Sequence, residues 1–258
     1  MRDLCEEIAD DMDIVVGVSP TYDSRNEMKK FLPPSCVHNT TEVIKPMITK
    51  FLDFQRKCVD IKGFTKDNPD PKKRLRSIFI ILDDCMFDEQ VLKGKSIREL
   101  FMNGRWFNVF VLNAMQYVMD MKPALRTNCD YIISMREPDA DNRKKLYKYF
   151  FGIFKTQAMF ETVFAKFTEH YGAIVLDKTI PTMIPEECVF WYRADPKPIE
   201  YRMGSDVIWS LHEKFYVSEA ERQRKDEEEG GPQTVAAILR RDDAPDDDKV
   251  KKGKTKGG

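Results

Sequence analysis

The amino-acid sequence predicts an α/β fold built on a mainly parallel sheet. Residues 77–84 include five consecutive apolar side chains, which is typical of a strand buried on both faces. Similar short apolar runs alternate along the chain with stretches of helical periodicity. This alternation favours parallel strands joined by right-handed crossovers, with helices on both faces of the sheet.

In the first third of the chain, each element is bounded by a change of pattern. Residues 3–11 place apolar side chains on one helical face, and 13–19 form a short apolar run that ends at a proline, as expected of a strand. Residues 42–60 again show helical spacing. A polar, proline-containing connector over 66–73 then leads to the strand at 77–84, which is the strongest strand signal in the sequence.

The remaining elements continue the alternation. Residues 96–102 read as a short helix, followed by strands over 106–112 and 130–134. Later segments with helical or apolar periodicity predict helices over 141–151, 156–170 and 206–215, and strands over 172–176 and 188–192.

The composition limits the class of protein. Of 258 residues, 42% are hydrophobic, which is enough for a core and excludes a fully disordered chain. Lys and Arg number 42 against 43 Asp and Glu, so a uniformly basic nucleic-acid binder is not expected. The six cysteines are scattered, without a C-x-x-C pair or a nearby histidine cluster. This argues against a disulfide scaffold or a zinc module and favours a reducing compartment.

Neither a membrane span nor a signal peptide is expected. The apolar runs are far shorter than a bilayer requires, and the first seven residues are too charged for a signal peptide. We therefore expect no stable membrane insertion.

The composition changes near Ser218. Beyond it, acidic and basic blocks alternate with glycine and proline, so we expect a folded domain over 1–217 and a disordered charged tail over 218–258. A short helix near 235–239 is the only element expected in the tail. Its basic end could touch DNA or another subunit, although a solubilising role is the commoner one for such blocks.

Two acidic residues, Asp83 and Asp84, directly follow the strongest strand. The carboxyl ends of strands are where open α/β sheets bind ligands. There, one carboxylate can orient Mg²⁺ and a second can polarise an attacking water. A capped turn is the alternative interpretation of this pair.

The next strand supplies further candidates. Gln116 follows it, where an amide can contact a phosphate or the attacking water, and Arg105 precedes it, where a guanidinium can reach a phosphate across a subunit interface. The alternatives are a loop amide for Gln116 and a surface charge for Arg105. The fixed order of these residues with Asp83 and Asp84 on two neighbouring strands favours the functional interpretation.

Three blocks in this region resemble a known family. IFIILDDC, FMNGRWFNVFVLNAMQY and KPALRTNCDYIISMRE are similar to segments of the poxvirus-type virion DNA-packaging ATPases of large nucleocytoplasmic DNA viruses, which belong to the FtsK–HerA superfamily. The resemblance covers about residues 1–201. It implies a P-loop NTPase fold of the ASCE type with a doubly wound, mainly parallel sheet.

The resemblance also implies roles for individual residues. Asp83 matches the Walker B acid that orients Mg²⁺, and Asp84 matches the catalytic base, where the superfamily often has Glu. Gln116 matches the sensor amide, and Arg105 matches an arginine finger that acts on a neighbouring subunit's nucleotide. Arg126 and Arg136 are weaker candidates for phosphate or interface contacts, and salt bridges around 130–134 are their simpler interpretation.

One family feature is missing from the sequence. No G-x-x-x-x-G-K-[ST] phosphate loop occurs in the 258 residues, so ATP contacts from a Walker A segment are not expected within them. The GKS at 94–96 lacks the upstream glycine and follows the acidic strand. We interpret it as a turn with Ser96 as N-cap and Glu99 completing a capping box. The family's first strand and phosphate loop would thus lie before residue 1.

The resemblance implies an ATP- and Mg²⁺-dependent motor that translocates double-stranded DNA into a capsid. Its partners would be DNA, further copies of the chain in a ring, and capsid or portal components, in the virion or the host-cell cytoplasm. Residues 66–76 could form a DNA-contacting loop, although a solvated connector is the simpler interpretation. A non-catalytic relic or interaction protein is the main alternative, and an unrelated metal-dependent nuclease-like domain ranks last.

Overall fold

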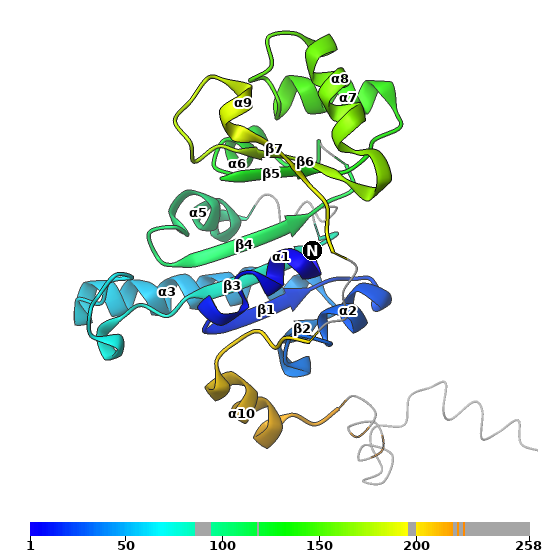
Figure 1. Cartoon of the computed structure of the whole chain (residues 1–258). Helices are drawn as coiled ribbons and strands as arrows, with labels where there is room; N and C mark the ends of the chain where they lie inside the picture. The colour runs from blue at the N-terminus through cyan, green and yellow to red at the C-terminus, as the bar shows by residue number, and fades with distance from the viewer. Residues whose placement is uncertain (86–93, 118, 196–199, 219–220, 222–223, 225–258) are drawn as a thin grey trace, which may run out of the picture. The chain divides into compact units, whose positions relative to one another are not determined.

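Figure 1 shows the structure, a computed structural model, which describes residues 1–85, 94–117, 119–195, 200–218, 221 and 224. The chain divides into a unit over Met1–Lys214 and a second over Phe215–Gly258. The helix expected near 235–239 lies outside the described residues, as does most of the predicted tail. The described helices and strands lie almost entirely in the first unit.

The first unit contains a four-stranded parallel sheet. Its order is β2-β1-β3-β4, with strands β1 (Ile14–Val18), β2 (Val37–His38), β3 (Ile78–Asp83) and β4 (Val109–Ala114). The first five residues of β3 are buried, as both-face burial in a central parallel strand requires. The predicted α/β class with a parallel sheet is confirmed.

Helices cover both faces of this sheet. On one face, α3 (Ile44–Lys62) and α5 (Lys95–Asn103) bury an apolar stripe against β3 and β4. Helix α3 ends at Gly63, whose left-handed φ of 62° suits a glycine. The doubly wound arrangement expected from the sequence is therefore present.

The opposite face is covered by α1 (Arg2–Glu6), the 3₁₀ turn η1 (Ala9–Asp11) and α2 (Tyr22–Met28). The single helix expected over 3–11 is thus broken into two short pieces. Gly17 of β1 lets α2 approach closely, since a Cβ at this position would lie 2.7 Å from the sulfur of Met28.

The later strands differ from the prediction. Strands β5 (Tyr131–Ser134), β6 (Ala173–Asp177) and β7 (Val189–Tyr192) form a separate antiparallel sheet in the order β5-β6-β7. The expectation of one mainly parallel sheet is wrong for this part. The reason lies in the connection: two helices, α7 (Ala140–Tyr149) and α8 (Gln157–Phe167), lead the chain out and back. It therefore re-enters antiparallel to the strand it left.

The bounds of one strand differ from the prediction, and several short elements were not predicted at all. Strand β4 begins three residues later than expected, because Trp106 lies in a turn after α5 that is closed by a 2.9 Å hydrogen bond from Val109 N to Gly104 O. Helix α10 (Asp206–Phe215) matches its prediction. The sequence did not predict the short elements: β2, α2, α6 (Pro123–Arg126), α9 (Pro185–Cys188), and the 3₁₀ turns Pro34–Cys36, Thr41–Val43, Pro71–Lys73 and Glu169–Tyr171.

Within the described ranges, no helix combines the length and apolarity needed to cross a bilayer.

Candidate functional site

The candidate site lies at the carboxyl end of the parallel sheet. Strand β3 delivers Asp83 and Asp84 to this edge, and its buried apolar residues hold it rigidly between β1 and β4. Because all four strands are parallel, the residues that follow β1 and β4 reach the same edge. This is the edge at which open α/β sheets bind their ligands.

Asp83 is oriented from the neighbouring strand β1. Ser19, which follows β1 and is fully buried, donates a hydrogen bond from Oγ to Asp83 Oδ2 at 3.2 Å. The same Oγ accepts from the backbone N–H of Thr21 at 3.2 Å, and Ser19 N donates to His38 O at 3.1 Å. Ser19 is therefore fixed from three directions and holds one carboxylate oxygen in place.

Asp84 is oriented from the strand on the other side. Gln116, two residues after β4, donates from Nε2 to Asp84 Oδ2 at 2.9 Å. The Asp84 backbone has a left-handed φ of 52°, while its N–H donates to Ala114 O at 3.0 Å. A non-glycine residue in this region costs free energy, which proteins tolerate most often at functional sites. The structure thus brings Asp83, Asp84 and Gln116 together, as the sequence predicted.

Cys85 packs directly behind the two acids. Its thiol is fully buried and donates to Val18 O at 3.3 Å. Burial raises the pKa of this thiol to about 12, and the charges of Asp83 and Asp84 act in the same direction. The thiolate is the reactive form of cysteine, so Cys85 serves as a packed hydrogen-bond donor here and is no nucleophile at neutral pH.

Arg105 lies elsewhere in the same chain. It precedes β4 and is therefore at the amino end of the sheet, whereas Asp84 is at the carboxyl end. Its guanidinium, with the side chain 71% exposed, pairs with the carboxylate of Asp130. The structure does not bring Arg105 to the two acids of its own chain.

Two further sequence expectations can be compared with the structure. Arg126 is buried and lies over the rings of Tyr149 at 4.6 Å and Phe150 at 5.6 Å, an aromatic environment in place of the expected salt bridge. The capping box at Ser96 and Glu99 is wrong. Gly94 is the N-cap of α5, because the helix begins one residue earlier than expected.

The side chains of that expected box have other partners. Ser96 Oγ lies 2.8 Å from Thr49 Oγ1, and Glu99 pairs with Arg56. Both contacts join α5 to α3. The GKS sequence is thus part of a contact between α5 and α3, two helices that cover the same face of the sheet.

Sequence relatives of the chain come from large DNA viruses. Protein L437 of Acanthamoeba polyphaga mimivirus is 30% identical over 213 residues, which is 81% of this chain and 72% of L437. The chain belongs to the same family as L437. Protein 088R of invertebrate iridescent virus 3 is 35% identical over 115 residues, 45% of this chain and 44% of 088R. No protein-family model matches the chain.

Two solved structures are similar in outline. B204, the DNA-packaging ATPase of Sulfolobus turreted icosahedral virus, has 15% identity and a TM-score of 0.46, covering 75% of this chain and 87% of B204. EssC of Geobacillus thermodenitrificans (ATPases 2 and 3) also has 15% identity, with a TM-score of 0.43, covering 57% of this chain and 31% of the EssC chain.

Sequence reasoning missed the residues that hold the β1 end of the site in this L437 relative. The local sequence around Ser19 indicates only the end of a strand. Arg25 also supports this end of the site, because its guanidinium donates to Ser19 O at 2.9 Å and Pro20 O at 2.7 Å. The one sequence feature that could have indicated them is their position after an apolar strand. That strand, β1, pairs with β3, but this pairing is visible only in the fold.

Strand β4 is the edge of the sheet within the described residues. Its sequence VFVLNA is mostly apolar, and Phe110 is 44% exposed. Both amide atoms of Asn113 are buried, and they have no hydrogen-bond partner in the described part of the chain. An unpaired buried amide costs about 1–3 kcal/mol of stability, so hydrogen-bond partners are missing at this edge of the sheet.

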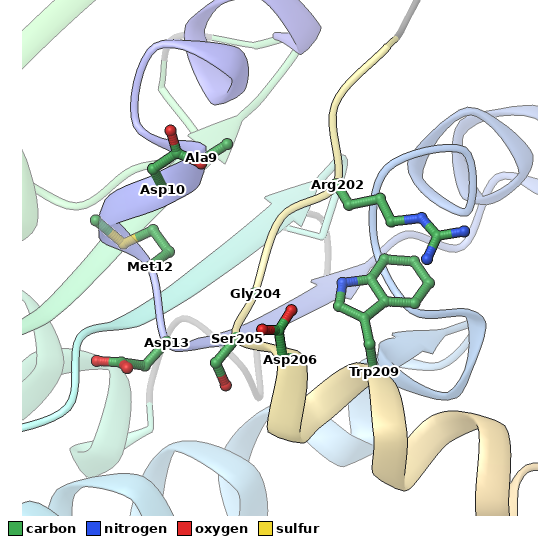
Figure 2. Close-up of a pocket in the computed structure, with 9 residues that line it drawn as sticks. All are labelled: Ala9, Asp10, Met12, Asp13, Arg202, Gly204, Ser205, Asp206 and Trp209. Atoms are coloured by element: carbon green, nitrogen blue, oxygen red, sulfur yellow. The ribbon is translucent and has the colours of Figure 1, made fainter.

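A separate cavity of about 380 Å³ lies at the opposite end of the sheet (Figure 2). It is formed by residues before β1 and by the start of α10, and it includes Asp13, Arg202 and Trp209. Asp13 already accepts hydrogen bonds from Ser77 N at 2.9 Å and from Arg76 at 3.0 Å. The Arg202 guanidinium lies 4.8 Å from the centre of the Trp209 ring. Ser205 N donates to Asp13 O at 2.9 Å and so joins the segment before β1 to the start of α10, away from Asp83 and Asp84.

The contact between Ser19 and Asp83 leads to a stability prediction. We expect Ser19→Ala to lower the free energy of unfolding by about 1–3 kcal/mol, because the partly buried Asp83 carboxylate and the Thr21 N–H lose their shared partner, the fully buried Ser19 hydroxyl. Urea denaturation would measure the change. Ser24→Ala on α2 is the matched control, since this residue is only partly buried, and it should change the stability by less than about 0.5 kcal/mol. Equal effects of the two substitutions would contradict the role given to Ser19.

Proposed function

We propose that the chain is the Walker B part of a nucleotide-hydrolysing motor that packages double-stranded viral DNA. The observation that carries this proposal is the pair of oriented carboxylates at the carboxyl end of the parallel sheet. Asp83 is held by Ser19, and Asp84 is held by Gln116, each from a different neighbouring strand. A capped turn would need neither of these long-range contacts.

Asp83 would help to hold Mg²⁺. No group of three or more His, Cys, Asp or Glu side chains in the described residues could hold a metal ion. Asp83 and Asp84 alone fit Mg²⁺ that is bound together with a nucleotide. Such an ion usually keeps several waters and takes one or two carboxylates together with phosphate oxygens. Bound Mg²⁺ would neutralise charge on the phosphates. Ser19 would fix the direction from which Asp83 approaches it.

Asp84 would act on the attacking water. Its carboxylate can accept a proton from that water, and the hydrogen bond from Gln116 orients the carboxylate and places the amide beside the same position. The left-handed backbone turns the Asp84 side chain away from the regular course of β3. Because Gln116 contacts Asp84 at 2.9 Å, a movement of the Asp84 carboxylate on nucleotide binding or hydrolysis would also move the Gln116 amide.

The phosphate-binding amides would come from outside the 258 residues. The edge of β4, with its exposed Phe110 and unpaired Asn113 amide, supports the addition of a further parallel strand at this position. A phosphate loop at the carboxyl end of that strand would face Asp83 and Asp84. The complete site would then operate in a ring, with Arg105 acting on the neighbouring subunit and with DNA and capsid components as partners.

The proposal is tested with two forms of the chain. One is the 258-residue chain, and the other carries in addition the reading frame immediately upstream of residue 1. We expect little ATP hydrolysis by the first form. If the upstream frame contains a G-x-x-x-x-G-K-[ST] loop, we expect Mg²⁺-dependent hydrolysis by the second, reduced about 10²–10⁴-fold by Asp84→Asn. Fluorescent ATP binding should survive this substitution.

Asp60→Asn is a matched control that removes one carboxylate of the same type from an exposed position near the end of α3. Hydrolysis that is as sensitive to this control as to Asp84→Asn would contradict the role of Asp84. Robust hydrolysis by the 258-residue chain would contradict the need for an external phosphate loop.

A further inference from the structure

The last turns of α7 carry a dense positive charge. Residues 143–149, RKKLYKY, contain four basic side chains and no acidic one. Lys144 and Lys148 are exposed, one helical turn apart, and neither forms an ion pair in the described part of the chain. Like charges at this spacing destabilise a helix slightly. Leu146 is buried in the same core cluster as Phe151, Phe154, Phe160 and Phe164, and it anchors this turn without help from the lysines.

Two tyrosines border these lysines. Lys145 Nζ lies 3.1 Å from the hydroxyl oxygen of Tyr117 and 5.1 Å from the centre of its ring. This hydrogen bond raises the pKa of the Lys145 ammonium, which therefore stays charged. Tyr149 lies between two cations, 4.6 Å from Arg126 and 5.2 Å from Lys148. Both tyrosines are about two-fifths exposed, at 41% and 38%.

The nearby carboxylates lie at the other end of the helix. Asp139 caps α7 by accepting from Asn142 N, and Asp141 is in the first turn. Glu137 accepts from Asp139 N and from the Asn142 amide. Acidic groups are therefore engaged at the helix start, and the last turns remain basic.

We propose that Lys144, Lys145 and Lys148, with Tyr117 and Tyr149, bind the phosphate backbone of double-stranded DNA. This inference rests on the proposed packaging function and names the surface that would hold its DNA. Lysines contact phosphates as point charges, and tyrosine hydroxyls donate to phosphate oxygens, so such a surface binds without reading the sequence. A duplex is favoured over a single strand because Arg126 and Lys145 already engage the tyrosine rings on which unpaired bases would stack.

The position of the surface gives it a direct connection to the candidate site. Tyr117, which contacts Lys145, directly follows Gln116, which donates to Asp84. A shift of the loop after β4 on hydrolysis would therefore reach the DNA-binding lysines through two adjacent residues. If these lysines were only a solvent-exposed helix face, a contact with the residue next to Gln116 would not be required.

The test measures binding of the full 258-residue chain to a labelled duplex of mixed sequence, by fluorescence anisotropy at several salt concentrations and without nucleotide. We expect Lys144→Glu/Lys148→Glu to weaken binding at least tenfold and to reduce the slope of log affinity against log salt by about two, at about one per phosphate contact. The control Lys50→Glu/Lys57→Glu makes the same charge change on exposed positions of α3 and should leave the slope unchanged.

Several results would overturn the proposal. These are equal losses in the α7 and α3 variants, a loss confined to Lys72→Glu/Lys73→Glu in the 66–76 connector, tighter binding of a single strand than of the duplex, or no duplex binding by the unsubstituted chain. Circular dichroism would show whether each variant is folded. The milder Lys144→Ala/Lys148→Ala variant is expected to reduce the salt slope equally, so a loss caused only by misfolding of the glutamate variant would be recognised. Because no nucleotide is present, failure here leaves the roles of Asp83 and Asp84 unaffected, and failure of the hydrolysis test leaves this surface standing.

Discussion

Replacing Arg105 with alanine is expected to lower ATP hydrolysis by about 10³-fold or more in the form of the protein that carries a phosphate loop, with ATP binding nearly unchanged. The physical reason is that an arginine finger stabilises charge that develops only in the transition state. Arg105 precedes β4 at the end of the sheet opposite to Asp84, and its side chain is exposed, so it is available to a second subunit. Steady-state hydrolysis and fluorescent ATP binding would measure the two effects.

The ion pair with Asp130 provides a control for a purely structural role of Arg105. If Arg105 acts only through this ion pair, Asp130→Ala should reduce hydrolysis as much as Arg105→Ala. If it acts on a neighbour, Asp130→Ala should have little effect. Mixing Arg105→Ala subunits with Asp84→Asn subunits should also restore part of the activity, because an intact site then meets an intact arginine. No recovery on mixing would contradict action in trans.

Phe160→Ala is expected to lower the free energy of unfolding by about 3–5 kcal/mol, the largest stability effect expected for this chain. Phe160 on α8 is fully buried and is the centre of an aromatic cluster. Its ring lies 5.2–5.9 Å, between centroids, from four others: Tyr147, Phe151, Phe154 and Phe164. Removing it leaves a cavity and ends all four contacts at once. Urea denaturation would measure the loss.

Met159 is the adjacent control. Its side chain is 44% exposed, so Met159→Ala should change the stability by less than about 0.5 kcal/mol. Equal losses at the two positions would show that the cluster does not form the core of the second sheet. The core cluster that contains Phe160 includes none of the residues that contact Asp83 and Asp84, so Phe160→Ala should also leave the contacts of these two acids intact.

The parallel sheet was predictable because its pattern is local. Five consecutive apolar residues in β3 can be satisfied only by burial on both faces, and this requirement is visible in the sequence. The antiparallel second sheet was not predictable from such a pattern. Strands β5 to β7 read as apolar runs in either arrangement, and the direction of β6 is decided by the return path of α7 and α8.

The site divides in a similar way. Asp83, Asp84 and Gln116 were identified from their places directly after apolar strands, and the structure brings them together. Ser19 lies 64 residues before Asp83, and nothing in its local sequence distinguishes it from an ordinary strand stop. Its contact depends on β1 pairing with β3 in a register that sets Val18 against Leu82. Long-range pairing therefore decided the supporting residues of the site.

The sequence by itself determined the α/β class, the buried acidic strand and the order of the candidate residues, because these follow from periodicity and from residue types in local succession. Only the tertiary structure decided which side chains hold the two acids, where Arg105 lies, and that the basic end of α7 sits beside Tyr117. These depend on contacts between segments far apart in the chain, whose free energy is set by strand register and helix packing and leaves little trace in any local pattern.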